Sequence, residues 1–449
     1  MRLLSTASIL AALALPATAQ ASPALSLPIE QHVLGNGLRL VFAPDPSLDD
    51  VTVLVRYDVG SADDPDGKDG LAHLVEHLMF DGSEHVPRGE HFRWIERVGG
   101  WGFNAQTGMD DTSYFATVPP GALATLFWLE SDRMGFLAGQ IEPRRLEHER
   151  QLVADELNEK VLDRGLGSVP DVAMREVFPP WHPYHRGHET GSLANVTVRD
   201  VRAFLRTWYA PRNATVFVAG RFDPAAALAL ADKYFGDLPT PASPARPALP
   251  ATWKTPDVRV DMAAGVTRDT VVIAWPAPAY GQPADAALDL AASALTDPLG
   301  RLQRELLHGG LVVQVGAHES SFRRGSTFTV TATVADGKSP EDVVAAVEDA
   351  MRRLGESVSA EECARARAEW ADVILLRLQT SAGRAHWLAG APASRASWDL
   401  AKYDALTPAD VARAVHETLA SGNRTVVVVH HDARYPARGV VLRRTEGGS

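Results

Sequence analysis

One pattern occurs twice in the chain, at a constant separation of 210 residues. A Thr-x-x-Asp-Val segment is followed by an Asn-x-Thr-Val-x-Val segment at 197–218 and again at 407–428, and the copies align without a gap. Threonine three residues before aspartate is typical of a helix N-terminus, and a valine-rich run is typical of a strand. Seven positions that match at one offset favour a duplication. We therefore expect an α+β fold of two homologous α/β-sandwich domains.

The region between the two copies is rich in proline. Prolines recur through 239–256, and so many of them cannot continue a helix or lie in a central strand. This predicts an extended linker between an N-terminal domain at 22–238 and a C-terminal domain at 257–433. A length of 449 residues agrees with two or more domains, at roughly 100–200 residues each. We expect the tail at 434–449 to be loosely ordered.

The first 21 residues are typical of an export signal. Arg2 is followed by a mostly apolar stretch over 3–16 and by small residues that suit cleavage after Ala19 or Ala21. A membrane anchor is the alternative, but the apolar run is shorter than the about 20 residues that a span needs. Because no later stretch is long and apolar enough to cross a bilayer, we expect a secreted or periplasmic protein.

Net charge and cysteine content narrow the functional classes. The net charge of −12 argues against a nucleic-acid partner held mainly through its phosphates. Cys363 is the single cysteine, which excludes an intramolecular disulfide and a cysteine-rich zinc site. Any metal must therefore be held by histidine, aspartate or glutamate.

The segment from 70 to 80 combines an amphipathic helix with metal-binding side chains. Its apolar residues recur with helical spacing: Leu71, Leu74, Val75, Leu78 and Met79. His73, Glu76 and His77 then fall on the opposite face. Two imidazoles one turn apart can bind one zinc ion, and a carboxylate beside them can deprotonate a water. A solvated polar face is the alternative, so the interpretation needs a third ligand.

Candidates for that ligand occur in the acidic segment 142–159. Pro143 suits the first turn of a helix, and Glu149 and Glu156, seven residues apart, fall on one face of it. Acidic helices are more often solvated than metal-binding. Periodicity alone does not say which of the acids would bind a metal.

Several blocks in chain order resemble the pitrilysin/insulinase class of zinc metallopeptidases, which includes the mitochondrial processing peptidases. They are the inverted motif His73-Leu-Val-Glu76-His77 with Gly82 after it, Asn104-Ala105, Thr112-Ser-Tyr114, Glu149-Arg150 with Glu156, and the block 208–220. The blocks span about residues 30–240, and the duplicated plan covers most of the remainder. The resemblance implies a processing-peptidase-like fold and a zinc endopeptidase subunit acting on peptides or unfolded segments.

The resemblance also implies roles for individual residues. His73, His77 and Glu156 would bind one zinc ion per chain, and Glu76 would be the general base. Glu149 would accept a hydrogen bond from a ligating imidazole and fix its tautomer.

Asn104 and Ala105 would lie on an edge strand that binds the substrate in extended form. An ordinary half-buried strand at this position is the alternative.

One expected feature of the family is missing from the second half. Active relatives carry an Arg and a Tyr seven residues apart that bind the substrate backbone, and here those positions are Leu306 and Val313. Arg304 lies two residues out of register. A paralogous subunit, in a heterodimer, or a second copy of the chain could supply the pair. Alternatively, the chain could be a binding or structural subunit that still holds zinc. We favour the first explanation, because a structural zinc site has no need of Glu76.

Two other groups of histidines carry less weight. His182, His185 and His188 lie in a turn-rich loop, where solvated side chains are more common than a second metal site. His430 and His431 follow a predicted strand, and we assign them no role.

Overall fold

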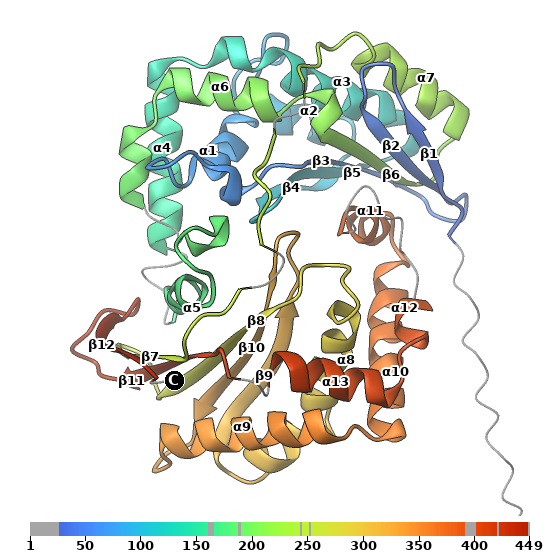
Figure 1. The fold of residues 1–449 in the computed structure, drawn as a ribbon. Coiled ribbons are helices and arrows are strands. Elements are labelled where there is room, and N and C mark those ends of the chain that lie inside the picture. The colour runs from blue at the N-terminus through green and yellow to red at the C-terminus, as the bar shows by residue number, and fades with distance from the viewer. Residues whose placement is uncertain are drawn as a thin grey trace, which may run out of the picture.

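The computed structural model describes residues 27–159, 166–186, 190–242, 245–250, 253–390, 401–419 and 422–447 (Figure 1). The predicted export signal and His188 lie outside these residues.

The described residues form two six-stranded sheets, one in each half of the chain. The first has the order β1-β2-β6-β3-β5-β4 and the second the order β12-β7-β11-β8-β10-β9, so from the second position onward the strands correspond. In each sheet one neighbouring pair is parallel, β2 with β6 and β7 with β11. The strands are β1 Glu30–Val33, β2 Arg39–Pro44, β3 Val51–Tyr57, β4 Trp101–Thr107, β5 Thr112–Val118, β6 Ala214–Gly220, β7 Val258–Ala264, β8 Thr270–Ala277, β9 Val312–Ser320, β10 Ser326–Val334, β11 Thr425–His431 and β12 Val440–Glu446.

Both copies of the repeated pattern have the predicted local structure. Thr197 and Thr407 each form a capping box, in which the threonine hydroxyl accepts the backbone N–H of the aspartate three residues later. The capped helices are α6 Val198–Trp208 and α13 Pro408–Thr418. The valine-rich runs that follow are β6 and β11, which occupy the same position in their sheets. The two-domain α+β prediction is confirmed.

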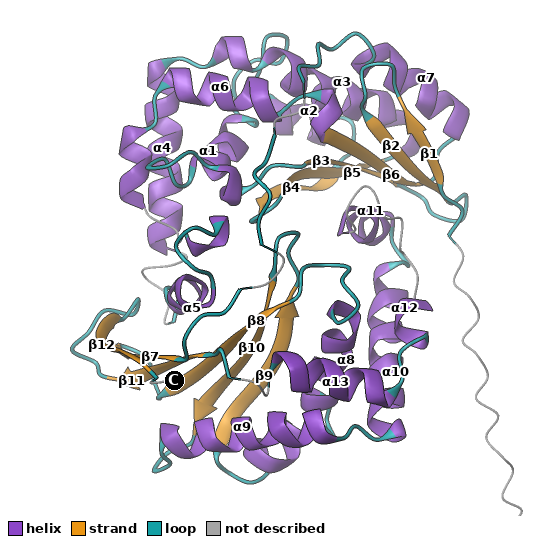
Figure 2. Cartoon of the chain, in the orientation of Figure 1, coloured by secondary structure: helices purple, strands orange, loops and turns teal. Residues whose placement is uncertain are grey.

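One face of each sheet is covered by helices from its own half of the chain (Figure 2). In the first half these are α1 Leu71–Leu78, α2 His91–Arg97, α3 Leu123–Phe136, α4 Pro143–Leu157, α6 and α7 Pro224–Phe235. In the second half they are α8 Asp285–Thr296, α9 Pro340–Glu356, α10 Ala360–Arg377, α12 Ala401–Asp404 and α13. Successive side chains of a strand point to opposite faces of the sheet, and here both faces are apolar. The second face of each sheet must therefore also be buried against other residues.

That second face is covered by a helix from the other half of the chain. Helix α5, Val169–Val177, packs Val169, Ala173 and Val177 against β7, β8 and β11 of the second sheet. Helix α11, Ser381–Gly390, packs Ala385 and Leu388 against β2, β3 and β6 of the first. Figure 1 shows both helices between the two sheets. The exchange is reciprocal, and it buries both inner faces.

An ionic joint also connects the two halves. Oδ1 of Asp63 forms an ion pair with Nε of Arg246, which lies in the linker, at 2.8 Å. The same oxygen forms a second ion pair at 2.8 Å with Nη2 of Arg324, which lies in the turn between β9 and β10. The Asp63 side chain is only 3% exposed. Burial by itself raises the pKa of the Asp63 carboxyl, but the two guanidinium groups hold this pKa below its usual range. The joint therefore contains an ionised carboxylate at neutral pH.

The linker and the tail are more ordered than their composition suggests. The described parts of 239–256 lie outside helices and strands, but Trp253 donates its indole N–H to the carbonyl of Val177 at 3.0 Å. The prediction of a loosely ordered tail is wrong, because β12 pairs with β7 at the edge of the second sheet. Val440, Val441 and Leu442 of this strand are all exposed, so the pattern lacks the alternation that identifies a half-buried strand.

Candidate metal centre

The site is built on helix α1, which has the predicted amphipathic face. Leu71, Leu74, Val75 and Leu78 are fully buried. Asp64 lies before the helix and accepts the backbone N–H groups of Gly70 at 2.7 Å and Ala72 at 2.8 Å. Its buried carboxyl therefore satisfies donors that the helix cannot satisfy itself. The first turn, which carries His73, is fixed at its start.

Helix α4 brings the third predicted ligand to the histidines. Nε2 of His77 lies 3.1 Å from Glu156, and Nε2 of His73 lies 3.6 Å from the other oxygen of the same carboxylate. One donor atom from each of the three residues lies within 4.8 Å of the others, and no other such group of His, Cys, Asp or Glu occurs among the described residues. All three side chains are 20–25% exposed, so the cluster is open to solvent.

The donor set fits a catalytic zinc ion. Two imidazoles and one carboxylate leave a coordination position open, whereas structural zinc sites are usually closed by four protein ligands. The geometry brings together His73, His77 and Glu156 without any further protein donor in the group. The residues present therefore fit the metal that the sequence predicts.

Glu149 lies on the other side of His77, where its carboxylate is 8% exposed. Its Oε2 is 3.7 Å from Nδ1 of His77, which is longer than a hydrogen bond but close enough for an ion pair. Burial alone lowers the pKa of the His77 imidazole, but the Glu149, Glu156 and Glu76 carboxylates raise it above its ordinary value. The site thus attracts positive charge.

Glu76 faces the edge strand β4. The hydroxyl of Thr107, the last residue of this strand, donates to Oε2 of Glu76 at 2.5 Å. Asn104 and Ala105 lie on the same strand, which pairs with β5 and has no second neighbour in the described sheet. Asn104 is exposed and Ala105 is half-buried, and the Ala105 backbone N–H donates to the Asn104 side chain at 2.9 Å.

Sequence reasoning missed two residues of the site, Asp64 and Thr107. Asp64 precedes the helix by seven positions, outside the usual capping register. Thr107 lies at the end of β4, two positions after Ala105, so alternation places both side chains on one face of the strand. This alternation in the sequence could have indicated that Thr107 faces the site.

The positions expected for an Arg and a Tyr lie in the second half of the fold. Leu306 is fully buried in a π-helical turn over Gln303–Leu307, and Val313 is 45% exposed on the edge strand β9. Arg304 lies in the same turn and is exposed.

Two histidines of the loop around residue 182, His182 and His185, form hydrogen bonds within the protein. The expectation of a solvated His182 is wrong: it is 1% exposed, its Nδ1 accepts the N–H of Tyr184, and its Nε2 is 3.1 Å from the carbonyl of Arg324. Residues distant in sequence cover it, among them Trp253. His185 bonds the carbonyl of Phe178 at 2.7 Å.

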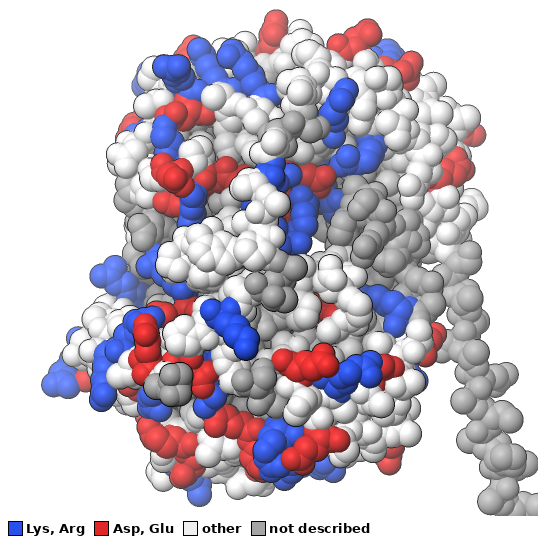
Figure 3. All heavy atoms as spheres, viewed as in Figure 1, with Lys and Arg blue, Asp and Glu red and all other residues white. Residues whose placement is uncertain are grey.

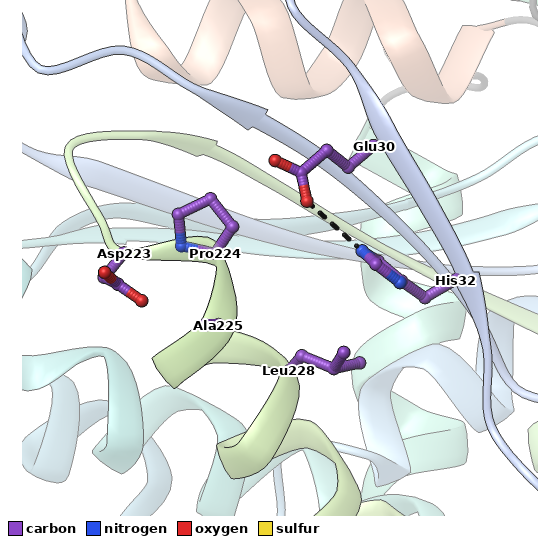
Figure 4. Close-up of a pocket in the computed structure, with 6 residues that line it drawn as sticks. All are labelled: Glu30, His32, Asp223, Pro224, Ala225 and Leu228. Carbon is purple, nitrogen blue, oxygen red and sulfur yellow. Dashed lines mark hydrogen bonds and ion pairs between the residues drawn. The ribbon is translucent and has the colours of Figure 1, made fainter.

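A cavity of about 380 Å³ lies elsewhere on the surface, and the residues that line it are distant in sequence from the predicted site residues. It lies between β1 and the start of α7, where Glu30 is 3.4 Å from His32 (Figure 4). None of the predicted site residues lines it. On the face in Figure 3, basic and acidic side chains both occur on each domain.

Two related α+β domains, a His-His-Glu cluster on two packed helices and a carboxylate facing an edge strand define the architecture of an inverted-motif zinc metallopeptidase. Residues 39–164 match the family described as insulinase (peptidase family M16), and residues 195–369 match the one described as peptidase M16 inactive domain. The chain belongs to the M16 peptidase family.

Relatives of known sequence or structure agree with this assignment. The zinc protease PqqE of Helicobacter pylori is 30% identical over 310 residues, which are 67% of this chain and 68% of the relative. The crystal structure of a protease from Helicobacter pylori superposes with a TM-score of 0.82 at 24% identity, covering 90% of this chain and 99% of that one.

A longer structural relative is the periplasmic protease PqqL of Escherichia coli, with a TM-score of 0.73 at 18% identity. The match covers 91% of this chain and 48% of PqqL, so this chain spans about half the length of that protein. In the described part of the present chain, no helix has the length and apolar character needed to cross a membrane.

Proposed function

We propose that this chain is a zinc-dependent endopeptidase subunit that hydrolyses peptides or unfolded segments. The observation that carries the proposal is the convergence of His73, His77 and Glu156 beside Glu76, which faces the same edge of the sheet. The zinc proteases among its relatives support the reaction class.

In this proposal the protein holds the metal and moves the proton. Zinc, when bound by His73, His77 and Glu156, would acidify a water and polarise the scissile carbonyl. Glu76 would take the proton from the attacking water and deliver it to the leaving amine. Glu149 would orient the His77 ring through Nδ1.

The substrate would pair with β4. An extended peptide can add to a free strand edge through backbone hydrogen bonds, with Asn104 and Ala105 beside it. A segment that lies flat along an edge must be unfolded, so the chain would cleave peptides in preference to folded proteins.

The chain would act with a partner and outside the cytoplasm. Leu306 and Val313 occupy the positions of the substrate-binding Arg and Tyr, so a paralogous subunit or a second copy would supply that pair. The signal-like first 21 residues support a periplasmic or secreted location, as does the likeness to a protease called periplasmic.

The alternative is a catalytically weak or inactive binding subunit. The buried Leu306 favours it, as does the match of residues 195–369 to a domain described as inactive.

Peptide hydrolysis at known zinc occupancy separates the two functions. The mature chain is assayed alone and with a candidate paralogous partner, beside Glu76→Gln. Activity that needs zinc and is lost in Glu76→Gln establishes the peptidase, and dependence on the partner establishes a shared site. If one zinc binds but no pairing cleaves a peptide, the chain is a binding subunit. Full activity of Glu76→Gln contradicts the mechanism.

A further inference from the structure

The contact between Thr107 and Glu76 joins the base to the strand beside it. At 2.5 Å between Thr107 Oγ1 and Glu76 Oε2, this is a short hydrogen bond from a neutral hydroxyl to a carboxylate. Thr107 is partly buried, and so is Glu76. The bond connects residues 31 positions apart in sequence, from two different elements, α1 and β4.

The surrounding hairpin fixes the direction of that bond. Thr112, the cross-strand partner of Thr107, is fully buried and donates its own proton to the carbonyl of Val59 at 2.9 Å. The two threonine hydroxyls are 3.5 Å apart, at the limit of a hydrogen bond. A carboxylate can only accept, so the proton of the Thr107 hydroxyl is the one directed at Glu76.

We propose that Thr107 is a positioning residue for the reaction: its hydroxyl holds Oε2 of Glu76 and thereby fixes the direction in which the carboxylate points. This inference rests on the proposed function. A glutamate has three rotatable side-chain bonds, and a general base must lie within hydrogen-bond reach of the proton that it abstracts. A tether to a β-strand restricts the carboxylate to a narrow range of orientations before a substrate arrives.

The same strand would also bind the substrate. Ala105 and Thr107 share one face of β4, and the peptide would pair with the free edge of this strand at Asn104 and Ala105. Strand β4 thus sets both the position of the scissile bond and the aim of Glu76.

The test uses Thr107→Val, which keeps the size and β-branching of threonine but removes the hydroxyl, and Thr107→Ser, which keeps the hydroxyl. We expect Thr107→Val to lower kcat about 10- to 100-fold, the range for a misdirected catalytic group, with KM within about twofold. Thr107→Ser should recover most of the rate. Zinc content should stay at one per chain in both, since Thr107 is not part of the His-His-Glu group.

A second measurement tests binding without turnover. In the Glu76→Gln background, the dissociation constant of an uncleaved peptide is compared with and without Thr107→Val, and we expect no more than a twofold change. A large change there, or a rate that Thr107→Ser does not recover, would mean that Thr107 maintains the strand and not the base. Crystal structures of the metal-free forms should show the Glu76 carboxylate displaced in Thr107→Val only.

Ser320 provides a matched control. It ends β9, the counterpart of β4 in the second sheet, and pairs with Thr327 as Thr107 pairs with Thr112. Ser320→Ala should leave kcat unchanged. If Glu76→Gln is fully active, the proposed function fails. If Glu76→Gln is inactive but Thr107→Val keeps the full kcat, only the role of Thr107 fails.

Discussion

At the scale of single residues, the proposed role of Glu149 leads to a prediction about zinc affinity. The Glu149 carboxylate is buried and faces the nitrogen of His77 that is turned away from Glu156. Residues that orient a ligating imidazole usually contribute 10- to 100-fold in affinity. We therefore expect Glu149→Gln to weaken zinc binding by about that factor, measured by competition with a chelator. Glu147→Gln on the same helix is the control, because the Glu147 side chain is 68% exposed. Equal zinc affinity in the two variants would contradict the role of Glu149.

A second residue-scale prediction concerns pH. Nδ1 of His85 lies 2.5 Å from Asp132, and this carboxylate raises the pKa of the exposed imidazole above its ordinary value. A raised pKa means that the folded state binds the proton more tightly than the unfolded state. The pair therefore stabilises the folded state fully at pH values below the pKa of His85 in the unfolded chain. This stabilisation is lost as the pH rises through the pKa of His85 in the folded protein. His85→Asn should lower the free energy of unfolding at pH 6 and have little effect at pH 9, measured by urea titration. An equal loss at both pH values would exclude the charged pair.

At the scale of elements, the contacts of Asp64 at the start of α1 lead to a prediction about helix stability and zinc binding. Asp64→Ala removes the acceptor for two N–H groups at the turn that carries His73, which should cost about 1 kcal/mol and weaken zinc binding. Thr407→Ala removes a cap of α13 in the other domain. We expect a similar loss of stability there with unchanged zinc affinity, measured by chemical unfolding and chelator competition. If both variants bind zinc like the parent chain, the cap has no influence on the ligand.

The sequence predicts individual helices and strands better than it predicts which surfaces pack against each other. The repeat correctly predicted two helix N-termini and two strands, because both signals are local in the chain. The three ligand candidates could be chosen from the resemblance, but the role of each remains a prediction. The partners of α5 and α11 were not predictable, because an apolar stripe does not specify the surface that buries it. His182 was misjudged for the same reason: Trp253, which covers it, comes from the linker.

At the scale of the whole molecule, the ionic joint holds the two halves in place. Removal of one partner from a buried ionic cluster is strongly destabilising, so Asp63→Asn should lower the free energy of unfolding by about 3 kcal/mol at pH 7. Asp66, paired with Arg186, is 95% exposed, and Asp66→Asn should cost less than about 1 kcal/mol. Chemical unfolding of both variants checks the difference. Equal losses would show that the joint contributes no more than a surface ion pair.

The reciprocal exchange of α5 and α11 has a consequence for the order of folding during synthesis. Helix α5 leaves the ribosome before any strand of the sheet that buries it has been made, and the inner face of the first sheet stays uncovered until α11 follows more than 160 residues after the last strand of that sheet. Neither half can therefore complete its apolar packing while the other is missing. The nascent N-terminal half therefore exposes an apolar surface while the residues between β6 and α11 are synthesised, and we expect it to be bound by chaperones that recognise unfinished chains.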